Sequence, residues 1–433
     1  MPEKQKINIL WFTRDLRIRD NESLYKVMQE DLPFLAVYIF DEFFFNSKQY
    51  GFRKIGKFRA KFLLESVLDL EKNLDHKKIP FLKKFGKTQD IFKQISEEFD
   101  IQKIFCQKEW TKEEVDLENQ IKEVLPNVKW SKSYTQLLLT PDFVKQKLDK
   151  IPLLFTTFRQ KVEKNLTIRN EFGTENLVYN KSFFDLKLKN NDVTLSSLGF
   201  DDFEINQSSA FPLSGGETGG LQRLKSYFFE TKNLSIYKET RNGLVGEDYS
   251  SKFSAWLALG NLSAVSVYHE IKKYEAEFGS NESTYWLIFE LLWRDFFKFT
   301  SMQFRDKIFY KNGILDQQYN FRPDQNAITD WVNGETNSDF INANMLEIRN
   351  TGWMSNRGRQ NVASYFCKIL KQDWRIGASY FEEMLIDYDV HSNYANWMYL
   401  AGVGNDPRSR TFNAEKQAEQ YDADKKFRNL WLK

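Results

Sequence analysis

The sequence predicts an α/β domain with a parallel sheet at the N-terminus, joined by a long linker to an all-α C-terminal domain. Three observations predict this fold class. Short apolar runs alternate with charged amphipathic stretches over residues 1–130, a polar segment follows over 131–214, and apolar residues recur at helical spacing over 215–433. At about 100–200 residues per domain, the length of 433 residues also favours two or three domains over one.

Residues 1–130 show the alternation of a parallel α/β sheet. The apolar runs INILWF, PFLAVYIF, IPFLKKF and IQKIFC have the length of strands. The stretch FRAKFLLESVLDLEKNL, after the second run, places apolar residues on roughly one helix face, namely Ala60, Leu63, Val67, Leu70 and Leu74. Strands that alternate with helices predict parallel pairing through crossover helices. No G-x-G-x-x-G follows the first run, so the sequence lacks that dinucleotide-binding fingerprint.

The rest of the chain divides into a linker and a helical domain. Over residues 131–214 the alternation is lost, and the part NNDVTLSSLGFDDFEINQSSAFPLSGGE is rich in Ser, Asn, Gly and Pro. This composition predicts a long connector that runs over the surface. From Glu217 onward, segments such as STYWLIFELLWRDFFKF and ASYFEEMLI repeat apolar residues every three or four positions. We therefore expect residues 215–433 to form one helical domain.

Composition excludes several classes of protein and site. Lys and Arg total 62 against 60 Asp and Glu, so any anionic partner must meet a local basic patch. Two cysteines, Cys106 and Cys367, and three scattered histidines argue against a disulfide framework and a metal site. No apolar run reaches 18 residues, and the N-terminus lacks a signal-peptide pattern. We expect a reduced, cytoplasmic protein that binds neither a metal nor a membrane.

The helix predicted over residues 282–299 places a carboxylate among aromatic side chains. The residues on one face are Trp286, Glu290, Trp293 and Phe297. Burial on that face would raise the pKa of the Glu290 carboxyl and let it donate a hydrogen bond. Arg294 lies one turn past Glu290, so the alternative is an ordinary Glu–Arg surface pair on a wide amphipathic helix. Spacing alone does not decide between the two interpretations.

The segment YKETRNGLVGEDYSSKFSAW, residues 237–256, has the pattern of an anion site. After a glycine-containing loop, four polar residues run into a helix: Ser250, Ser251, Lys252 and Ser254. Hydroxyl groups and exposed amides at the start of a helix suit phosphate. The alternative is a plain serine N-cap.

Two later segments carry groups that suit a heteroaromatic ligand. TGWMSNRGRQN holds Asn356, Arg357 and Arg359, and LIDYDVHSNYANWMY holds Asp387, Asp389, Asn393, Trp397 and Tyr399. Amide and carboxylate groups offer donors and acceptors to ring N–H and C=O groups, and an Arg beside a carboxylate orients both. The alternatives are a solvated helix end for the acids, core packing for the aromatics, and solvated surface charges for the basic residues.

Taken together, these segments resemble the photolyase/cryptochrome family. The blocks WFTRDLRIRDNESL, YKETRN, DYSSKFSAWLALGNLS, FELLWRDFF, TGWMSNRGRQNVAS, DWR and NWMYLAGVGNDPR are similar to its signature blocks, in the same order and over nearly the whole chain. Within the family the sequence is most similar to the cryptochrome-DASH branch. It has SNRGRQ without a histidine, and Tyr399 where enzymes that act on double strands usually place Trp.

The resemblance implies a Rossmann-like N-terminal domain and a helical domain that holds FAD folded in a U. The residues that would hold FAD are Tyr237, Ser250, Ser251, Lys252, Ser254, Glu290, Arg294, Asn356, Arg359, Asp387, Asp389 and Asn393. The residues implied in catalysis are Glu290, Asn393, Tyr399 and the inner electron donors Trp397 and Trp374. Glu163 matches the pterin contact of the family and implies a 5,10-methenyltetrahydrofolate antenna.

The implied activity is blue-light-driven repair of cyclobutane pyrimidine dimers, in which excited reduced FAD lends an electron to the dimer. Tyr399 in place of Trp would weaken stacking on the extruded dimer by about 1 kcal/mol. Single-stranded or looped-out lesions would then be preferred, because their bases cost least to extrude. The candidate DNA-binding residues are Arg241, Trp293, Arg294, Arg357, Tyr399 and Arg410. We expect a monomer.

Two expectations concern light activation and the choice between enzyme and receptor. Phe321 stands where the family places its outermost donor Trp, so photoreduction should be slow or should leave through a tyrosine such as Tyr319. The alternative function is a blue-light signalling receptor with little repair activity. Such receptors usually carry a long variable tail, whereas this sequence ends at Lys433, so we favour the enzyme.

Overall fold

The computed structural model describes residues 4–179, 188–406 and 411–433. Its strands are β1 (Lys6–Trp11), β2 (Phe34–Asp41), β3 (Lys48–Gln49), β4 (Phe52–Arg53), β5 (Phe81–Gly86), β6 (Asp100–Gln107) and β7 (Lys129–Ser133). The helices of the N-terminal half are α1 (Glu22–Met28), α2 (Glu42–Asn46), α3 (Lys57–His76), α4 (Thr88–Glu98), α5 (Lys112–Val124), α6 (Pro141–Lys147) and α7 (Phe155–Glu163).

The helices of the C-terminal half are α8 (Glu217–Lys225), α9 (Tyr237–Thr240), α10 (Ser254–Leu259), α11 (Ala264–Phe278), α12 (Glu282–Phe304), α13 (Gln325–Asn333), α14 (Asp339–Thr351), α15 (Asn356–Ser364), α16 (Trp374–Met384), α17 (Val390–Ala401), α18 (Ala414–Tyr421) and α19 (Lys426–Trp431). In the part of the chain that the structure describes, no helix combines the length and apolarity needed to cross a membrane.

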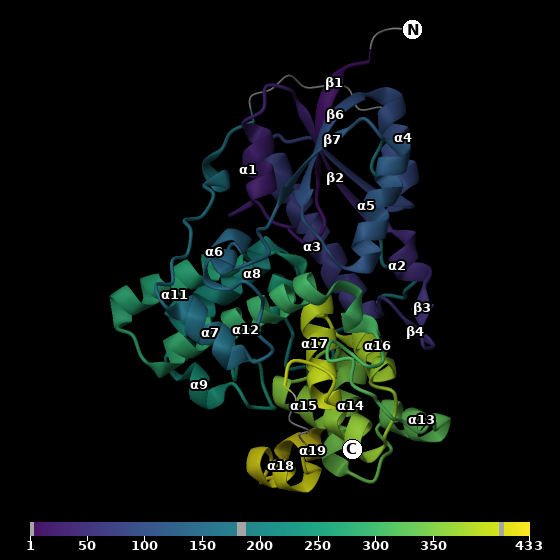
Figure 1. Cartoon of the computed structure of the whole chain (residues 1–433), viewed down its shortest axis with the longest axis vertical. Coiled ribbons are helices and arrows are strands. Elements are labelled where there is room, and N and C mark those ends of the chain that lie inside the picture. The colour runs from purple at the N-terminus through teal and green to yellow at the C-terminus, as the bar shows by residue number, and fades with distance from the viewer. Residues whose placement is uncertain (1–3, 180–187, 407–410) are drawn as a thin grey trace.

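The N-terminal part is a parallel sheet in the order β5-β2-β1-β6-β7 with helices on both faces (Figure 1). The four predicted apolar runs form β1, β2, β5 and β6, which confirms the α/β prediction. Residues of α3 pack on one face and residues of α4 and α5 on the other, so β2 is buried along its whole length. After β1, the chain adds β2 and β5 on one side of β1 and then crosses to add β6 and β7 on its other side. The strand order therefore reverses at β1 and β6, where open α/β sheets form ligand crevices.

The expectation that residues 131–214 form a surface connector is wrong for the first half of that segment. β7 continues to Ser133 and pairs with β6. In α7, Phe155, Phe158 and Val162 are buried, and the helix packs against α12. The polar composition of the later residues hides this short apolar pattern when the segment is averaged. Residues 188–214, by contrast, contain neither helix nor strand.

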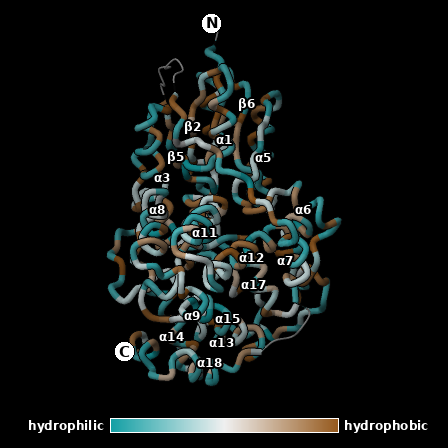
Figure 2. Tube along the Cα trace, turned by 90° about the vertical axis from the view of Figure 1, so that its left-hand side faces the viewer, coloured by the Kyte–Doolittle hydropathy of each residue, from teal (hydrophilic) through white to brown (hydrophobic). Residues whose placement is uncertain are grey.

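The C-terminal part is helical, as predicted, and α12 is its central element. Asn281 caps α12 by accepting backbone N–H bonds from Ser283 and Thr284, and the Thr284 hydroxyl completes a capping box. α12 contacts α7, α9, α11 and α17 around its circumference. Hydrophobic colour accordingly concentrates along α12 and in the strands in Figure 2. The functional side chains of α12 are therefore held by neighbours from both halves of the chain.

Candidate functional site

The helical part contains a cavity of about 1250 Å³ that gathers most of the predicted site residues. Its wall comes from α9, the loop before α10, α12, the start of α15 and the segment around the start of α17. The predicted residues that line it are Tyr237, Arg241, Ser250, Ser251, Lys252, Ser254, Glu290, Trp293, Arg294, Asn356, Arg359, Asp387 and Asp389. Residues more than a hundred positions apart in the sequence thus meet at one cavity.

A smaller cavity of about 500 Å³ continues from the larger one. The two share Asn356, Arg359, Asp387 and Asp389, and also Ser392 and Asn396. The smaller cavity adds Asn393 and Trp397 from α17. Asn393 donates from Nδ2 to the Ala378 carbonyl at 3.0 Å, which fixes its amide orientation. The shared lining residues make the two cavities adjoining arms of one site.

Arg359 and Asp387 form an ion pair where the two cavities meet. The guanidinium Nη2 donates to both carboxylate oxygens of Asp387, at 2.9 and 3.0 Å. Nε of the same arginine donates to the Met354 carbonyl at 2.9 Å, which holds the guanidinium in place. The Asp387 side chain is only 3% exposed. A buried carboxylate held in this way presents a fixed acceptor and charge to a ligand.

Glu290 pairs with an arginine from another helix, not with Arg294 on its own helix. Its carboxylate accepts a hydrogen bond from Arg241 of α9. Burial raises the pKa of Glu290, although Arg241 opposes the shift. Arg294 instead donates to the carbonyls of Gln136 and Leu257. The alternative of a Glu290–Arg294 surface pair is therefore wrong, because backbone carbonyls occupy the Arg294 guanidinium.

The loop before α10 presents hydroxyl groups to the larger cavity. The N-cap of α10 is Phe253 and has no side-chain cap bond, so the alternative of a serine N-cap is wrong. Ser250, Ser251 and Ser254 line the cavity with side chains that bond to no other described residue. Such uncommitted donors suit the phosphate and ribityl oxygens of a dinucleotide.

Lys252 contributes to this wall in a way that the sequence does not indicate. Its backbone has φ +64°, and its ammonium lies 3.2 Å from the centre of the Tyr249 ring and 4.8 Å from that of Trp353. The Lys252 ammonium is buried and has no hydrogen-bond partner among the described residues. Glu347 of α14 also faces it and raises the pKa of this lysine, although burial lowers that pKa more strongly. Lys252 thus places a buried amino group against the aromatic wall of the cavity.

Several predicted residues do not line either cavity. Trp374 is fully buried and donates to the Lys311 carbonyl at 3.0 Å. Tyr399 donates to Asp406 at 3.2 Å, and Arg357 lies 4.5 Å over the Tyr421 ring. Arg410 lies outside the described residues.

Glu163, the predicted antenna contact, is occupied by other protein groups. Its carboxylate accepts from the Tyr285 hydroxyl at 2.7 Å and lies 3.4 Å from Arg159. It lines neither of the two connected cavities. Both carboxylate oxygens of Glu163 therefore already have protein partners.

Trp397 joins the smaller cavity to an aromatic cluster. Its ring centre lies 5.1 Å from that of Phe381 and 6.2 Å from that of Trp331. Trp374 packs at 6.1 Å against Tyr394, one helical turn before Trp397 on α17. Tyr319 and Phe321 lie 6.2 Å apart, and the Tyr319 hydroxyl donates to the Gln372 carbonyl at 2.7 Å. The indole at the cavity wall is thus the inner end of a set of closely packed rings.

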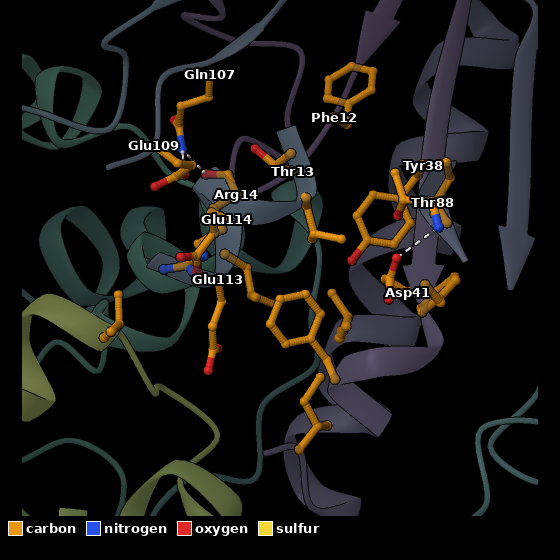
Figure 3. Close-up of a pocket in the computed structure, with 18 of the residues that line it drawn as sticks. Phe12, Thr13, Arg14, Tyr38, Asp41, Thr88, Gln107, Glu109, Glu113 and Glu114 are labelled. Atoms are coloured by element: carbon orange, nitrogen blue, oxygen red, sulfur yellow. Dashed lines mark hydrogen bonds and ion pairs between the residues drawn. The ribbon is translucent and has the colours of Figure 1, made fainter. Parts of the chain in front are cut away.

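A second large cavity, of about 1200 Å³, lies at the carboxyl edge of the parallel sheet (Figure 3). Phe12 and Tyr38 contribute aromatic surface. Its carboxylates are Asp41, Glu109, Glu113, Glu114, Glu118 and Glu382. The two arginines in its wall are engaged, Arg14 with Glu114 and Arg59 with the Lys54 carbonyl. Among the described residues that line it, none offers a free cation to a phosphate, in contrast to the hydroxyl-rich cavity of the helical part.

Sequence reasoning missed three polar residues that support the site. Lys298 continues the i, i+4 series from Glu290 and Arg294 on α12, so spacing could have indicated it. Glu347 lies within a helix whose surroundings no local pattern identifies. Gln136 belongs to the segment expected to be a connector, and no sequence signal places it beside α12.

Comparisons with known proteins agree with this geometry. Residues 286–433 match the family model described as the FAD binding domain of DNA photolyase, and residues 8–175 match the model described as DNA photolyase. The chain is 41% identical to "Cryptochrome DASH" of Synechocystis over 98% of its length and 87% of the relative. It is 39% identical to "Cryptochrome DASH" of Xenopus laevis over 99% and 82%. The crystal structure of the Synechocystis cryptochrome covers 100% of this chain and 89% of its own, with a TM-score of 0.94 and 40% identity.

Proposed function

Because the chain belongs to the photolyase/cryptochrome family, with cryptochrome-DASH proteins as full-length relatives, we propose that it repairs cyclobutane pyrimidine dimers in DNA under blue light. Its cofactor is FAD, for which residues 286–433 form the family's binding domain. The observation that carries the proposal is the two-armed cavity, in which the partly exposed pair of Glu290 and Arg241 shares a wall with the buried carboxylate of Asp387. The exposed end of the cavity, at Glu290, would admit a substrate from solvent, and the buried end, at Asp387, would hold the cofactor.

The residues present fit FAD. The hydroxyls of Ser250, Ser251 and Ser254 have no other described partner and would bond its phosphate and ribityl oxygens. Asn393, Arg359 and Asp387 would orient the ring system, with the amide and the ion pair supplying donors and an acceptor. When bound and reduced, FAD supplies one electron to the dimer after absorbing blue light and recovers it after the ring splits. The protein positions the two partners and keeps the cavity polar groups in place.

At the solvent end, Glu290 and Trp293 would hold the damaged bases. Trp293 is stacked on Phe155 of α7, with ring centres 3.7 Å apart and an interplanar angle of 17°. A ring fixed in this way offers a firm surface for a base. The Glu290 carboxylate, held by Arg241, would accept a hydrogen bond from a ring N–H of a base.

We extend the proposal to a preference for single-stranded or looped-out lesions. Tyr399 is half-buried at the end of α17 and bonds to Asp406, so its phenol contributes nothing to the cavity wall. A dimer extruded from a duplex would therefore lack one stacking partner. A stacking deficit of about 1 kcal/mol corresponds to roughly fivefold weaker binding of the extruded dimer. Lesions that are already unpaired do not incur the cost of extrusion.

The test uses the full chain purified with its chromophore. Its absorption spectrum is recorded first, and blue-light repair is then followed on one dimer-containing oligothymidine, both alone and annealed to its complement. We expect bound FAD and faster repair of the single strand. Equal rates on both substrates would remove the strand preference. Bound FAD with repair of neither substrate would refute the enzyme and support the light receptor.

Glu290→Ala tests the role of the carboxyl at the solvent end. We expect roughly tenfold slower repair with FAD retained, because a hydrogen bond to a group of this kind contributes about 1.5 kcal/mol. The matched control is Glu282→Ala on the same helix, where the side chain is 78% exposed and pairs with Lys238. Repair by the Glu290 variant at the rate of the control would exclude a role for this carboxyl.

A further inference from the structure

We propose that Lys298 is a positioning residue that keeps the Asp389 carboxylate charged and oriented at the cofactor cavity, and that Gln136 of the inter-domain segment fixes Lys298 in turn. The inference rests on the proposed function, because it concerns how the same cavity holds FAD. Neither residue lines the larger or the smaller cavity, so both act through Asp389.

Lys298 lies on the buried side of α12 and makes two bonds there. Its side chain is 2% exposed. Nζ donates to Asp389 Oδ2 at 3.0 Å and to Gln136 Oε1 at 2.8 Å. The ammonium therefore joins a carboxylate of the cofactor cavity to the segment between the two domains.

Asp389 has both oxygens engaged by groups that favour the charged form. Oδ1 accepts the Ser392 backbone N–H at 2.8 Å, which caps α17, and Oδ2 accepts from Lys298. The residue lines both arms of the cavity. Although burial acts to raise it, the pKa of Asp389 is held well below its usual value, chiefly by Lys298. A carboxylate in this state is a fixed acceptor for a ring N–H of the cofactor.

The inter-domain segment is clamped to α12 on both sides of this bond. The backbone N–H groups of Leu138 and Leu139 donate to Asp295 at 3.1 and 2.7 Å, and Arg294 donates to the Gln136 carbonyl. The Gln136 amide donates to the Lys108 carbonyl at 2.8 Å and lies 3.5 Å from Glu109. Glu109 lines the acidic cavity at the sheet edge. Gln136 therefore cannot turn away from Lys298 without breaking bonds to the N-terminal domain.

The charged groups around the pair come from several elements. Lys298 faces Asp389, Arg294 and Glu109, and burial lowers the pKa of this lysine to about 8. Asp389 also faces His391, whose pKa is held well below its usual value mainly by burial. This imidazole is stacked on Trp110 at 4.9 Å and bonds to Ser301 at 2.7 Å, so it is neutral near pH 7. Arg294 and Arg14 also act on Asp389 through their charge, and Lys298 is the cation that bonds to its carboxylate.

Removal of the lysine charge should make the cofactor affinity depend on pH. A buried carboxyl without a cation has a raised pKa. In Lys298→Met, Asp389 should therefore be protonated in mildly acidic solution and lose its acceptor role. The affinity for FAD, measured by quenching of flavin fluorescence on the full chain, should fall at least tenfold at pH 6. It should recover only in part toward pH 8, because the ionised carboxylate still lacks the cation that orients it. Lys298→Arg should restore the affinity of the unmodified chain.

Two further measurements separate positioning from a merely structural role. The double variant Lys298→Met/Asp389→Asn has no carboxyl to titrate, so its weakened FAD affinity should be flat between pH 6 and 8. The unmodified chain should lose affinity above about pH 8, as Lys298 releases its proton, whereas Lys298→Arg should not. The comparison of the unmodified chain with Lys298→Arg keeps a basic residue at position 298 in both proteins. It therefore remains decisive if Lys298→Met fails to fold.

The outcomes distinguish this inference from the proposed function. The control is Lys307→Met, whose exposed lysine pairs with Asp316 and should leave the profile unchanged. A Lys298→Met profile parallel to that of the unmodified chain would overturn the positioning role, as would an identical alkaline loss in Lys298→Arg. In both cases the unmodified chain still binds FAD. Absence of FAD binding by the unmodified chain would instead overturn the proposed function itself.

Discussion

Gly377→Ala tests how tightly the inner donor Trp397 is built into the fold. Gly377 lies inside α16, which packs against α17. A Cβ at Gly377 would lie 2.2 Å from Cη2 of Trp397 and 2.6 Å from Cζ3. Carbon atoms in contact are normally about 3.5–4.0 Å apart, so the indole or the helix must move. The absence of a side chain at this position is what lets the Trp397 ring lie against α16.

Two opposing effects decide the magnitude. In a helix interior, replacing Gly with Ala normally stabilises by about 1 kcal/mol. Overpacking of a core costs about 1–3 kcal/mol, and occasionally more. Trp397 is 2% exposed and is flanked by Phe366, Phe381 and Trp331, so the upper end applies. We expect Gly377→Ala to lower the free energy of unfolding by about 2 kcal/mol.

Urea unfolding followed by circular dichroism measures this change. The same substitution is made in a Trp397→Leu background, which removes the ring atoms that the new methyl group would meet. There we expect the sign to reverse, with Gly377→Ala raising the free energy of unfolding by up to about 1 kcal/mol through helix propensity. Equal destabilisation in both backgrounds would refute the reasoning, as would stabilisation of the otherwise unmodified chain.

The remaining predictions concern pH and light. Burial, opposed by Lys252 and Arg359, raises the pKa of Glu347 to about 8, so the folded chain holds a proton that the unfolded chain releases above its ordinary pKa of 4.5. The stability that this proton contributes is complete below pH 4.5 and declines toward pH 8, by at most about 1.4 kcal/mol per pH unit. In Glu347→Gln the urea midpoint of unfolding should therefore decline less between pH 4.5 and 8. The same dependence of the midpoint on pH in both chains would contradict the raised pKa of Glu347. Trp397→Phe should abolish photoreduction of oxidised FAD but spare repair after chemical reduction, and normal bleaching of the flavin band would remove Trp397 from the path. Phe321→Trp should accelerate photoreduction, whereas an unchanged rate would mean that another donor, such as Tyr319, already serves.

The strands and helix α3 were predictable because their signals are local. Each of the four apolar runs became a strand, and the apolar face from Ala60 to Leu74 became the buried face of α3. Periodicity of this kind is contained within a few turns or residues and does not depend on distant partners. Helix α7 was missed because its three apolar positions lie in a segment whose average composition is polar.

The site was predictable as a set of residues but not as a set of contacts. Spacing placed Glu290 and Arg294 on one helix, yet Glu290 bonds to Arg241, which is 49 positions away. The sequence allows the hydroxyls around the start of α10 to be either helix caps or anion ligands, and the N-cap at Phe253 excludes the capping role.

The sequence by itself determined which segments become strands and helices and which polar residue types the cavity offers, because these follow from short-range backbone geometry and the burial of apolar faces. Only the tertiary structure decided which charge meets which. A buried ionic group bonds to whatever partner the packing of the two domains brings within about 3 Å. Lys298 meets Asp389 from 91 positions away and Gln136 from 162 positions away, and no pattern within the sequence records either distance.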